Sequence, residues 1–333
     1  MCYPLLKIIW NITKKCGYDC EICATSSNRD ELSFDEKNSV LESILSIGTH
    51  NISELDFSGG DPLFDTDSIK IVKRAIDVLS KDKISVTTTG KGISNIISKG
   101  EDLHRLLYNC EVTIDCIDHI PNYLRKDTSY ISTNRNALDD VAEKISNITI
   151  NIPILHPEMT DDSICKLVDA IAKININVIS VNLIRLMSVG RMSTTTYPYV
   201  CSPERFIETF VKYAKNTCIK NVHIHCAFRG KILGNQCNML KNKVGVDCSG
   251  NVFACAWGGY IKEFDKNNIC ENPFYIGNLL EMPLSEILKN KYATRLKELI
   301  KENPTRHCRV YCYRNSNSND IFDDMDPLFT NHN

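Results

Sequence analysis

Short apolar runs alternate with longer segments of helical period from residue 5 to residue 191. The apolar runs are rich in β-branched residues, which predicts strands. Between the first two runs, Leu41, Ile44 and Leu45 recur at helical spacing, and residues 33–36 (Ser-Phe-Asp-Glu) form a capping box that predicts the start of this helix. The strands predicted in this way cover residues 5–13, 52–58, 84–88, 110–115, 148–154 and 178–184.

The alternation of strands and helices predicts how the strands are paired. Consecutive strands separated by helices lie parallel and are joined by right-handed crossovers. Six such units predict an α/β fold, a partial (β/α)6 TIM-like barrel. In a parallel barrel the loops at the C-terminal ends of the strands line the active face, so we expect the loops after the first, second and fourth strands to meet at one mouth.

The second half of the chain has a different pattern. The repeat stops after Arg191, and a helix with Ser202 and Pro203 at its start leads into a cysteine-rich segment. We therefore predict a barrel domain over 1–220 and a small cysteine-rich domain over 221–314. Residues 315–333 are rich in Asn, Ser and Asp, and this composition predicts a mobile tail.

Length and charge limit the classes of protein to consider. A chain of 333 residues with 43% apolar residues can bury one large core and a smaller appended unit. The net charge of -2 indicates no basic surface for nucleic acid, and no run reaches the ~18 apolar residues that a membrane helix needs. Because the N-terminus also lacks the features of a signal peptide, we predict a cytoplasmic protein without nucleic-acid or membrane partners.

The 16 cysteines change this picture, because thiols of a large chain without a signal peptide usually stay reduced and can bind metal. Cys16, Cys20 and Cys23 form a CxxxCxxC run in the loop after the first predicted strand. Three thiolates this close can hold three irons of a 4Fe-4S cluster and leave the fourth iron open to a ligand. Structural zinc sites and ferredoxins use other spacings with a fourth ligand nearby.

The CxxxCxxC spacing resembles that of the radical SAM superfamily. The resemblance implies that the open iron binds the amino and carboxylate groups of S-adenosylmethionine, and that an electron from the cluster cleaves this molecule to a 5'-deoxyadenosyl radical. The radical would then abstract a hydrogen atom from a substrate. A flavodoxin- or ferredoxin-type protein would supply the electron.

The loop after the second predicted strand carries Gly59, Gly60, Asp61 and Pro62 and is similar to the Gly-Gly-Glu-Pro loop of the same family. Glycines let a backbone approach a ligand closely, and exposed carbonyls there can accept hydrogen bonds from an ammonium group. The resemblance therefore implies that these four residues bind S-adenosylmethionine. The aspartate is one methylene shorter than the glutamate of the family pattern.

Further residues of the S-adenosylmethionine site follow from the same resemblance. Thr89 ends the third predicted strand, and Thr113 lies in a segment similar to the fourth strand of peptide-modifying relatives. Thr113 and Arg125 would bind the carboxylate and ribose side, since a guanidinium offers two parallel donors to a carboxylate. Arg185 joins this set at the end of the sixth strand, and Arg191 would mark the exit toward the second domain.

Candidates for proton or hydrogen-atom transfer are few. Asp115 and Asp118, at the expected barrel mouth, could act as bases, and Cys116 could donate a hydrogen atom to a substrate radical. Each also has an ordinary interpretation, which we prefer. The two aspartates would then be turn-forming acceptors and the cysteine a packed thiol.

The cysteine-rich segment carries a second motif. Cys237 is followed after twelve residues by Gly250 and then by Cys255, which matches the CX(9-15)GX4C pattern of the SPASM and twitch extensions of radical SAM enzymes. A turn at residues 249–251 would join two short strands in a hairpin and bring both thiols to one side.

Cys308 and Cys312 can supply the remaining two ligands of a four-cysteine site. A full SPASM domain would add a CX2CX5CX3C run that this chain lacks, so we predict one auxiliary iron-sulfur cluster, of the 4Fe-4S type. Two alternatives stay open. Zinc could occupy the four-thiolate site, and some ligands could be exchanged for other thiols nearby, which are Cys226, Cys248 and Cys270.

These motifs predict a radical SAM enzyme, with peptide maturation in ribosomal natural-product biosynthesis as the leading function. The alternative is a radical dehydrogenase or epimerase of a sugar, an aminocyclitol or another small metabolite. The cluster loop begins only fifteen residues from Met1, so we expect no leader-peptide-binding domain before the barrel, which weakens the peptide interpretation. A non-catalytic iron-sulfur electron carrier or scaffold would need neither an open iron nor a Gly-Gly loop.

Overall fold

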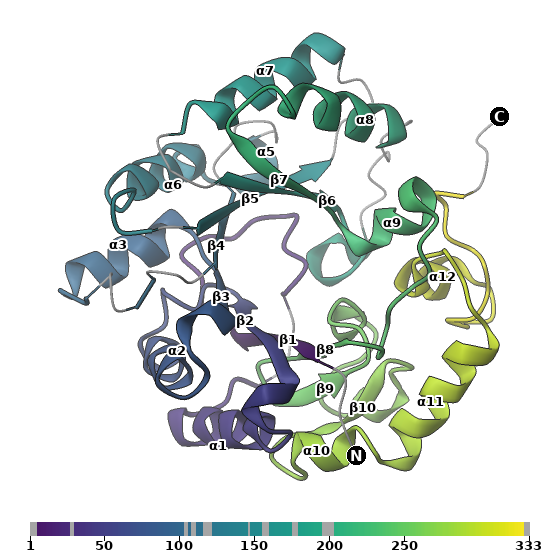
Figure 1. Ribbon diagram of the computed structural model, residues 1–333. Helices are drawn as coiled ribbons and strands as arrows, with labels where there is room; N and C mark the ends of the chain where they lie inside the picture. Colours follow the sequence, from purple (N-terminus) through teal and green to yellow (C-terminus); the bar gives the residue numbers. More distant parts are fainter. Residues whose placement is uncertain are drawn as a thin grey trace.

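One ten-stranded sheet organises the computed structural model, which describes residues 5–26, 30–102, 106–107, 111–115, 122–145, 147–154, 160–174, 179–194 and 203–329. The strand order is β10-β9-β8-β1-β2-β3-β4-β5-β6-β7, and from β1 to β7 each strand lies parallel to the next. The sheet curves into the open barrel seen in Figure 1, which confirms the predicted partial (β/α)6 barrel. Its parallel strands are β1 (Leu6–Thr13), β2 (Ile52–Gly59), β3 (Ile84–Thr87), β4 (Glu111–Ile114), β5 (Asn147–Ile154), β6 (Ile179–Arg185) and β7 (Ile219–Ile224).

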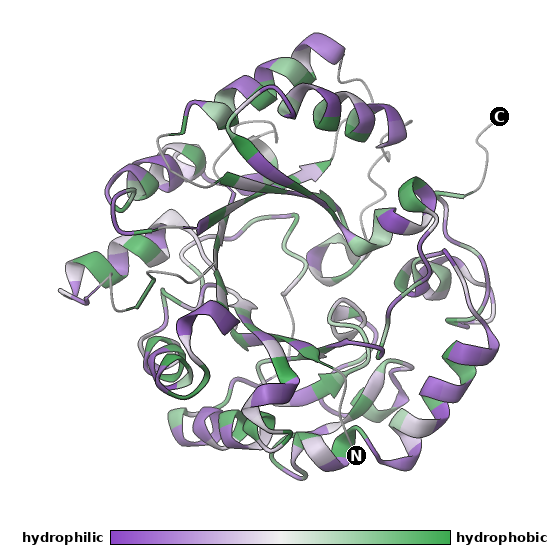
Figure 2. Cartoon of the chain, viewed as in Figure 1, coloured by the Kyte–Doolittle hydropathy of each residue, from purple (hydrophilic) through white to green (hydrophobic). Residues whose placement is uncertain are grey.

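Amphipathic helices cover the outer face of this barrel, with their apolar sides turned to the strands (Figure 2). The predicted capping box is present, because Ser33 accepts a hydrogen bond from the Glu36 amide while the Glu36 carboxylate accepts one from the Ser33 amide. The helices of this part of the chain are α1 (Phe34–Leu45), α2 (Thr66–Leu79), α3 (Gly90–Ser98), the short α5 (Asn122–Arg125) at the barrel mouth, α6 (Tyr130–Asp139), α7 (Asp161–Ala172) and α8 (Pro203–Ala214). Short 3-10 helices are η1 (Thr49–Asn51), η2 (Lys81–Lys83), η3 (Gly190–Thr194), η4 (Gly258–Tyr260) and η5 (Ile269–Glu271).

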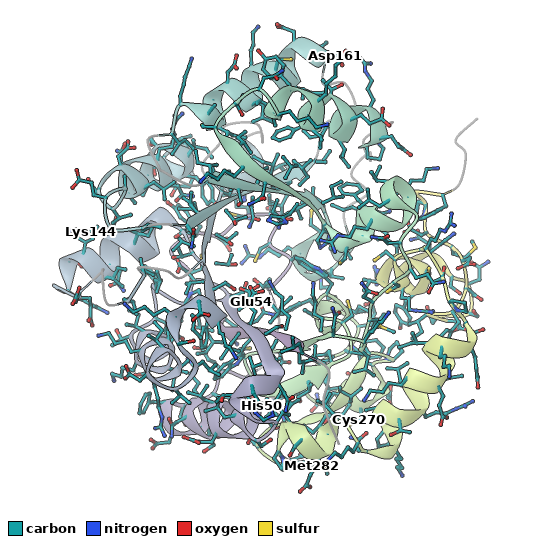
Figure 3. The ribbon with its side chains drawn as sticks, viewed as in Figure 1. His50, Glu54, Lys144, Asp161, Cys270 and Met282 are labelled. Carbon is teal, nitrogen blue, oxygen red and sulfur yellow. The ribbon has the colours of Figure 1, made fainter. Side chains whose placement is uncertain are left out.

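The two faces of β1 to β3 differ in polarity. Alternate residues of β1, such as Ile8 and Trp10, are fully buried in the main hydrophobic core. On the other face, Glu54 accepts hydrogen bonds from Lys7 Nζ at 2.6 Å and from Ser85 Oγ at 2.5 Å. Figure 3 shows Glu54 on the inner side of the curved sheet. The interior of the open barrel is therefore partly polar.

The cysteine-rich segment continues the same sheet on the far side of β1. Strand β8 (Lys243–Val246) lies parallel to β1, and β9 (Asn251–Phe253) and β10 (Tyr275–Asn278) follow in antiparallel order. The turn of the predicted β8–β9 hairpin contains Gly250 at φ +79°, a backbone conformation that favours glycine. The remaining helices are α9 (Cys226–Leu233), α10 (Leu284–Ile287), α11 (Lys291–Glu302) and α12 (Arg309–Asn315).

Two features of the domain ends add to the sequence analysis. The expected boundary near residue 220 falls at the start of β7, which pairs with β6 and extends the barrel sheet. The segment expected to be mobile is packed on the protein as far as residue 329, because Ile321 and Asp326 are buried among its polar residues. Within the described residues, no helix combines the length and apolar character needed to cross a bilayer.

Candidate active site and cluster centres

The three cysteines of the first motif lie together in the loop that leaves β1. Cys16, Cys20 and Cys23 are half-buried, and none of them is in a disulfide. Burial, with smaller contributions from the Asp61 carboxylate and the thiols of Cys20 and Cys23, raises the pKa of Cys16 to about 12. Three mutually close, unpaired thiols are the donor set that a cluster with one open iron requires.

The Gly-Gly loop after β2 packs directly against this cysteine loop. The Gly60 amide donates to the carbonyl oxygen of Thr13 at 2.6 Å, and the Asp61 amide donates to that of Lys15 at 2.8 Å. A Cβ atom on Gly59, which has φ +122°, would lie 2.5 Å from the Thr13 oxygen, and one on Gly60 would overlap the Lys15 oxygen. Only glycines allow the two loops to approach this closely.

The Asp61 side chain is fully buried and is bound to the loop after β3. It accepts hydrogen bonds from the Thr88 hydroxyl at 2.7 Å, the Thr89 hydroxyl at 2.6 Å and the Thr89 amide at 3.0 Å. Burial raises its pKa, although these hydrogen bonds oppose the shift. Asp61 therefore ties the β2 and β3 loops together, with Pro62 buried beside it and Thr89 capping α3.

Arg125 reaches the same mouth from α5. Its guanidinium forms a buried ion pair with Asp115 at the end of β4 and lies 4.5 Å from the centre of the Tyr130 ring. Although burial raises the pKa of Cys20, Arg125 opposes this shift through its charge and a hydrogen bond, so it lies beside that thiol. Half-buried Thr113 lies one residue before the end of β4, whereas Cys116 and Asp118 fall outside the described residues.

Asn134 is a site residue that the sequence analysis missed. Its side chain is fully buried, accepts a hydrogen bond from the Gly90 amide at 2.7 Å and donates one to the Asp115 carbonyl oxygen. It thereby joins the loops after β3 and β4. A polar residue on the buried face of α6 is the sequence feature that could have indicated this role.

Arg185 at the end of β6 and Arg191 in η3 occupy different environments. Arg191 donates from its backbone to the Cys23 oxygen at 3.0 Å and from its side chain to the Cys20 oxygen at 2.8 Å, so it clamps the cysteine loop. Arg185, expected to bind the cofactor, is buried in a pair of hydrogen bonds to Asp326 and lies 3.6 Å from the centre of the Tyr311 ring.

A buried charge network under the cysteine loop also escaped the sequence analysis. Lys37 of α1 is 1% exposed and donates to Glu31 at 3.0 Å and to Asp65 at 2.9 Å. Asp65 also binds Lys15 at 2.7 Å, and Glu31 accepts from the Thr13 hydroxyl at 2.7 Å. The network therefore anchors Thr13 and Lys15, shortly before the first cysteine.

Four thiols of the C-terminal part form a second group. Burial, with smaller contributions from the Cys226 and Cys237 thiols, raises the pKa of Cys255 to about 12. Burial also raises the pKa of Cys308, with additional effects from Asp326, Cys226 and Cys255. Cys226, Cys237, Cys255 and Cys308 are therefore neighbours in the fold.

The other cysteines of this part lie elsewhere. Cys312 is buried on α12 and groups with His307 and Asp324, with which it forms a cluster of possible ligands within 4.8 Å. Buried Cys248 donates to the Asp30 carbonyl oxygen at 3.9 Å. Cys270 is exposed (Figure 3). Of Cys226, Cys248 and Cys270, Cys226 is the thiol that raises the pKa of Cys237, Cys255 and Cys308.

A cavity of about 530 Å³ lies away from the barrel mouth. Its lining includes Leu6 at the N-terminal end of β1, Cys237, and the cationic residues Lys241, Lys297 and Arg309. Because Thr13 and the cysteine loop lie at the opposite end of β1, this cavity is distinct from the predicted S-adenosylmethionine site.

Comparison with known proteins agrees with this arrangement. The model of the radical SAM superfamily matches residues 10–171, and that of an iron-sulfur cluster-binding domain, SPASM, matches residues 237–313. A protein from Methanococcus maripaludis, described as "Probable GTP 3',8-cyclase", is 32% identical over 114 residues, which are 33% of this chain. The chain spans 36% of the length of this curated relative.

Solved structures share the fold over nearly the whole chain. SuiB of Streptococcus suis, bound to the precursor peptide SuiA, has a TM-score of 0.69 and 12% sequence identity, and the match covers 98% of this chain and 76% of that one. Native anSMEcpe with bound AdoMet has a TM-score of 0.52 and 15% identity, with coverage of 88% and 82%. At these identities the likeness shows the fold alone.

The family uses a 4Fe-4S cluster and S-adenosylmethionine as cofactors, and its SPASM extension binds auxiliary iron-sulfur clusters. The two groups of thiols on this chain fit those cofactors. The chain belongs to the radical SAM superfamily and carries a C-terminal SPASM iron-sulfur domain.

Proposed function

We propose that this enzyme modifies a peptide by hydrogen-atom abstraction, as part of the maturation of a ribosomally made natural product. The observation that carries the proposal is the extent of the fold match: 98% of the chain superposes on an enzyme described as bound to a precursor peptide. The partly polar interior of the open barrel supports it, because a peptide backbone needs polar partners when it enters a site.

Cys16, Cys20 and Cys23 are proposed to hold the 4Fe-4S cluster. With S-adenosylmethionine bound, this cluster supplies the 5'-deoxyadenosyl radical that takes a hydrogen atom from the substrate. The close packing of Gly59 and Gly60 on the cysteine loop fixes the distance between the cluster ligands and the cofactor loop.

The remaining residues at the mouth orient the bound molecule. Thr89 and Thr113 lie at the ends of β3 and β4, where polar side chains face a ligand at the barrel mouth. Arg125 keeps its guanidinium beside the cysteine loop because Asp115 fixes it there. Arg185 is engaged with Asp326, so we assign it to the junction with the C-terminal segment and not to the cofactor.

We further propose that Cys226, Cys237, Cys255 and Cys308 hold a single auxiliary cluster. Cys226 replaces Cys312 in the set expected from spacing, because its thiol raises the pKa of the other three, whereas the Cys312 thiol lies within 4.8 Å of ligand atoms of His307 and Asp324. Although burial opposes it, the neighbouring His225 lowers the pKa of Cys226 to about 6, so this thiol is the readiest of the four to bind as a thiolate.

A small metabolite is the second candidate substrate. It is favoured by the curated relative, whose described substrate is the nucleotide GTP, although the match covers only a third of this chain. A dehydrogenase or epimerase of a small metabolite would use the same cofactor site. An electron carrier or scaffold would not require the glycine contacts that join the two loops of that site.

The test is anaerobic reconstitution with iron and sulfide, followed by reduction in the presence of S-adenosylmethionine and a short peptide encoded beside the gene. We expect about eight irons per chain, 5'-deoxyadenosine formation that rises with the peptide, and a peptide whose mass has changed. The Cys16, Cys20, Cys23 triple Ala variant should keep about four irons and form no deoxyadenosine, while Cys270→Ala should match the wild type. An unchanged peptide beside a modified small metabolite would contradict the peptide proposal, and deoxyadenosine formation by the triple variant would contradict the cluster assignment.

A further inference from the structure

A third group of metal-ligating side chains lies in the C-terminal part, outside both cysteine sets. His307, Cys312 and Asp324 each offer one ligand atom, and these three atoms lie within 4.8 Å of one another. Imidazole nitrogen, thiolate sulfur and carboxylate oxygen are the donors that bind Zn²⁺ in proteins. We propose that these side chains form a mononuclear zinc site that joins α12 to the C-terminal segment.

The imidazole has a free donor atom at this place. His307 Nδ1 is buried and has no hydrogen-bond partner among the described residues. Asp324 Oδ1 lies 4.0 Å away, which is too far for a hydrogen bond. Two ligands bound at about 2.1 Å to a tetrahedral zinc lie roughly 3.4 Å apart. Because the Asp324 side chain is 63% exposed, it is free to make the small inward shift that this geometry requires.

Neighbouring groups already orient the three ligands. The His307 ring stacks on Phe329 with centroids 4.0 Å apart and an interplanar angle of 11°. The Thr305 hydroxyl donates to Asp324 Oδ1 at 2.6 Å, and Cys312 lies on α12, where its thiol is buried. Groups that contact the ligands of a metal and orient them in this way are typical of metal sites.

Cys312 is the thiol that remains when Cys226 completes the auxiliary cluster, so the inference rests on that part of the proposed function. The fourth zinc position would face solvent on the side of Asp324 and could be filled by water. The ion would also fix the segment around Asp326, whose carboxylate binds both Arg185 and the Cys308 amide. A zinc ion here would therefore stabilise the junction between the barrel and the auxiliary cluster.

The experiment uses the full chain, reconstituted anaerobically and cleared of loosely bound metal on a chelating resin. Zn²⁺ is then added and counted by elemental analysis, and Co²⁺ serves as a spectroscopic probe of thiolate ligation. We expect one zinc per chain beyond the cluster iron and a thiolate-to-cobalt absorption band. Both should be lost in Cys312→Ser, and zinc affinity should fall at least tenfold in His307→Gln, with the iron content unchanged. Cys270→Ser and His50→Gln, at exposed positions, are the matched controls.

Two results would overturn the inference. The first is a wild-type protein that binds iron but no zinc. The second is a Cys312→Ser variant that loses about four irons, since the thiol would then belong to the auxiliary cluster. If Cys312→Ser does not fold, His307→Gln at its partly exposed position still gives the zinc measurement. Iron loss in Cys226→Ala with zinc retained would support the inference. Zinc binding in an enzyme that never cleaves S-adenosylmethionine would support the inference and count against the proposed function alone.

Discussion

Arg185 and Asp326 form a buried, two-pronged ion pair that joins the end of β6 to the C-terminal segment. Nη1 lies 2.9 Å from Oδ2 and Nη2 lies 2.6 Å from Oδ1, and the two side chains are 3% and 0% exposed. The same carboxylate accepts a hydrogen bond from the Cys308 amide at 2.9 Å. One aspartate therefore links the barrel to a proposed ligand of the auxiliary cluster.

Asp326→Ala should destabilise the protein strongly, because it leaves the buried Arg185 guanidinium without its counterion. The expected loss in the free energy of unfolding is about 3–5 kcal/mol, measured by urea denaturation of the apo protein. Asp162→Ala is the matched control, since it breaks an ion pair with Lys166 in which both side chains are about three-quarters exposed, and it should cost less than about 1 kcal/mol. Equal losses in the two variants would contradict a buried pair.

Local patterns made the barrel and its cysteine loop predictable from sequence. The capping box at Ser33 and the glycines after β2 each act within a few residues or at the end of one strand, so their signals are readable in the chain. The Arg185–Asp326 pair could not be predicted from the sequence, because 141 residues separate its partners. The choice between Cys226 and Cys312 depends in the same way on how distant segments meet.

The burial of Lys37 could have been predicted from the sequence. It precedes Val40, Leu41 and Ile44 at helical spacing, and so it falls on the buried face of α1. A lysine at such a position needs buried acidic partners, but their identity as Glu31 and Asp65 follows only from the fold.

Lys37→Met should also be costly, because it removes the buried cation that Glu31 and Asp65 share under the cysteine loop. We expect a loss of about 3 kcal/mol in the free energy of unfolding and weaker retention of the first cluster, measured as iron per chain after gel filtration. Lys166→Met, at an exposed site, should leave both quantities near the wild-type values. If Lys37→Met retained all of its iron, the charge network would not be needed to hold the first cluster.

The stability of the protein should fall in acid through Asp65. Although burial opposes it, hydrogen bonds from Lys15, Ser68 and Lys37 hold the pKa of Asp65 well below its ordinary value. A carboxyl whose pKa is lower in the folded state contributes stability that is complete above its unfolded value, about 3.9, and is lost as the pH falls below it. Urea denaturation of wild type and Asp65→Asn from pH 3 to pH 7 should show a difference in the free energy of unfolding that becomes smaller below about pH 4. A difference that does not depend on pH would contradict the lowered pKa of Asp65.

Gly60→Ala tests the contact between the cofactor loop and the cysteine loop. The added Cβ would overlap the Lys15 carbonyl oxygen, and since this neighbour is backbone, the cysteine loop must move. We expect the variant to retain the auxiliary cluster, with about four irons per chain, and to lose at least tenfold in the rate of deoxyadenosine formation. Gly100→Ala is the control, because nothing lies within 4 Å of the point that its Cβ would occupy, although its φ of +64° strains an alanine. A larger effect on the rate in Gly60→Ala would therefore come from the steric contact and not from backbone strain, whereas equal rates in the two variants would show that the loops can separate without harm to the cofactor site.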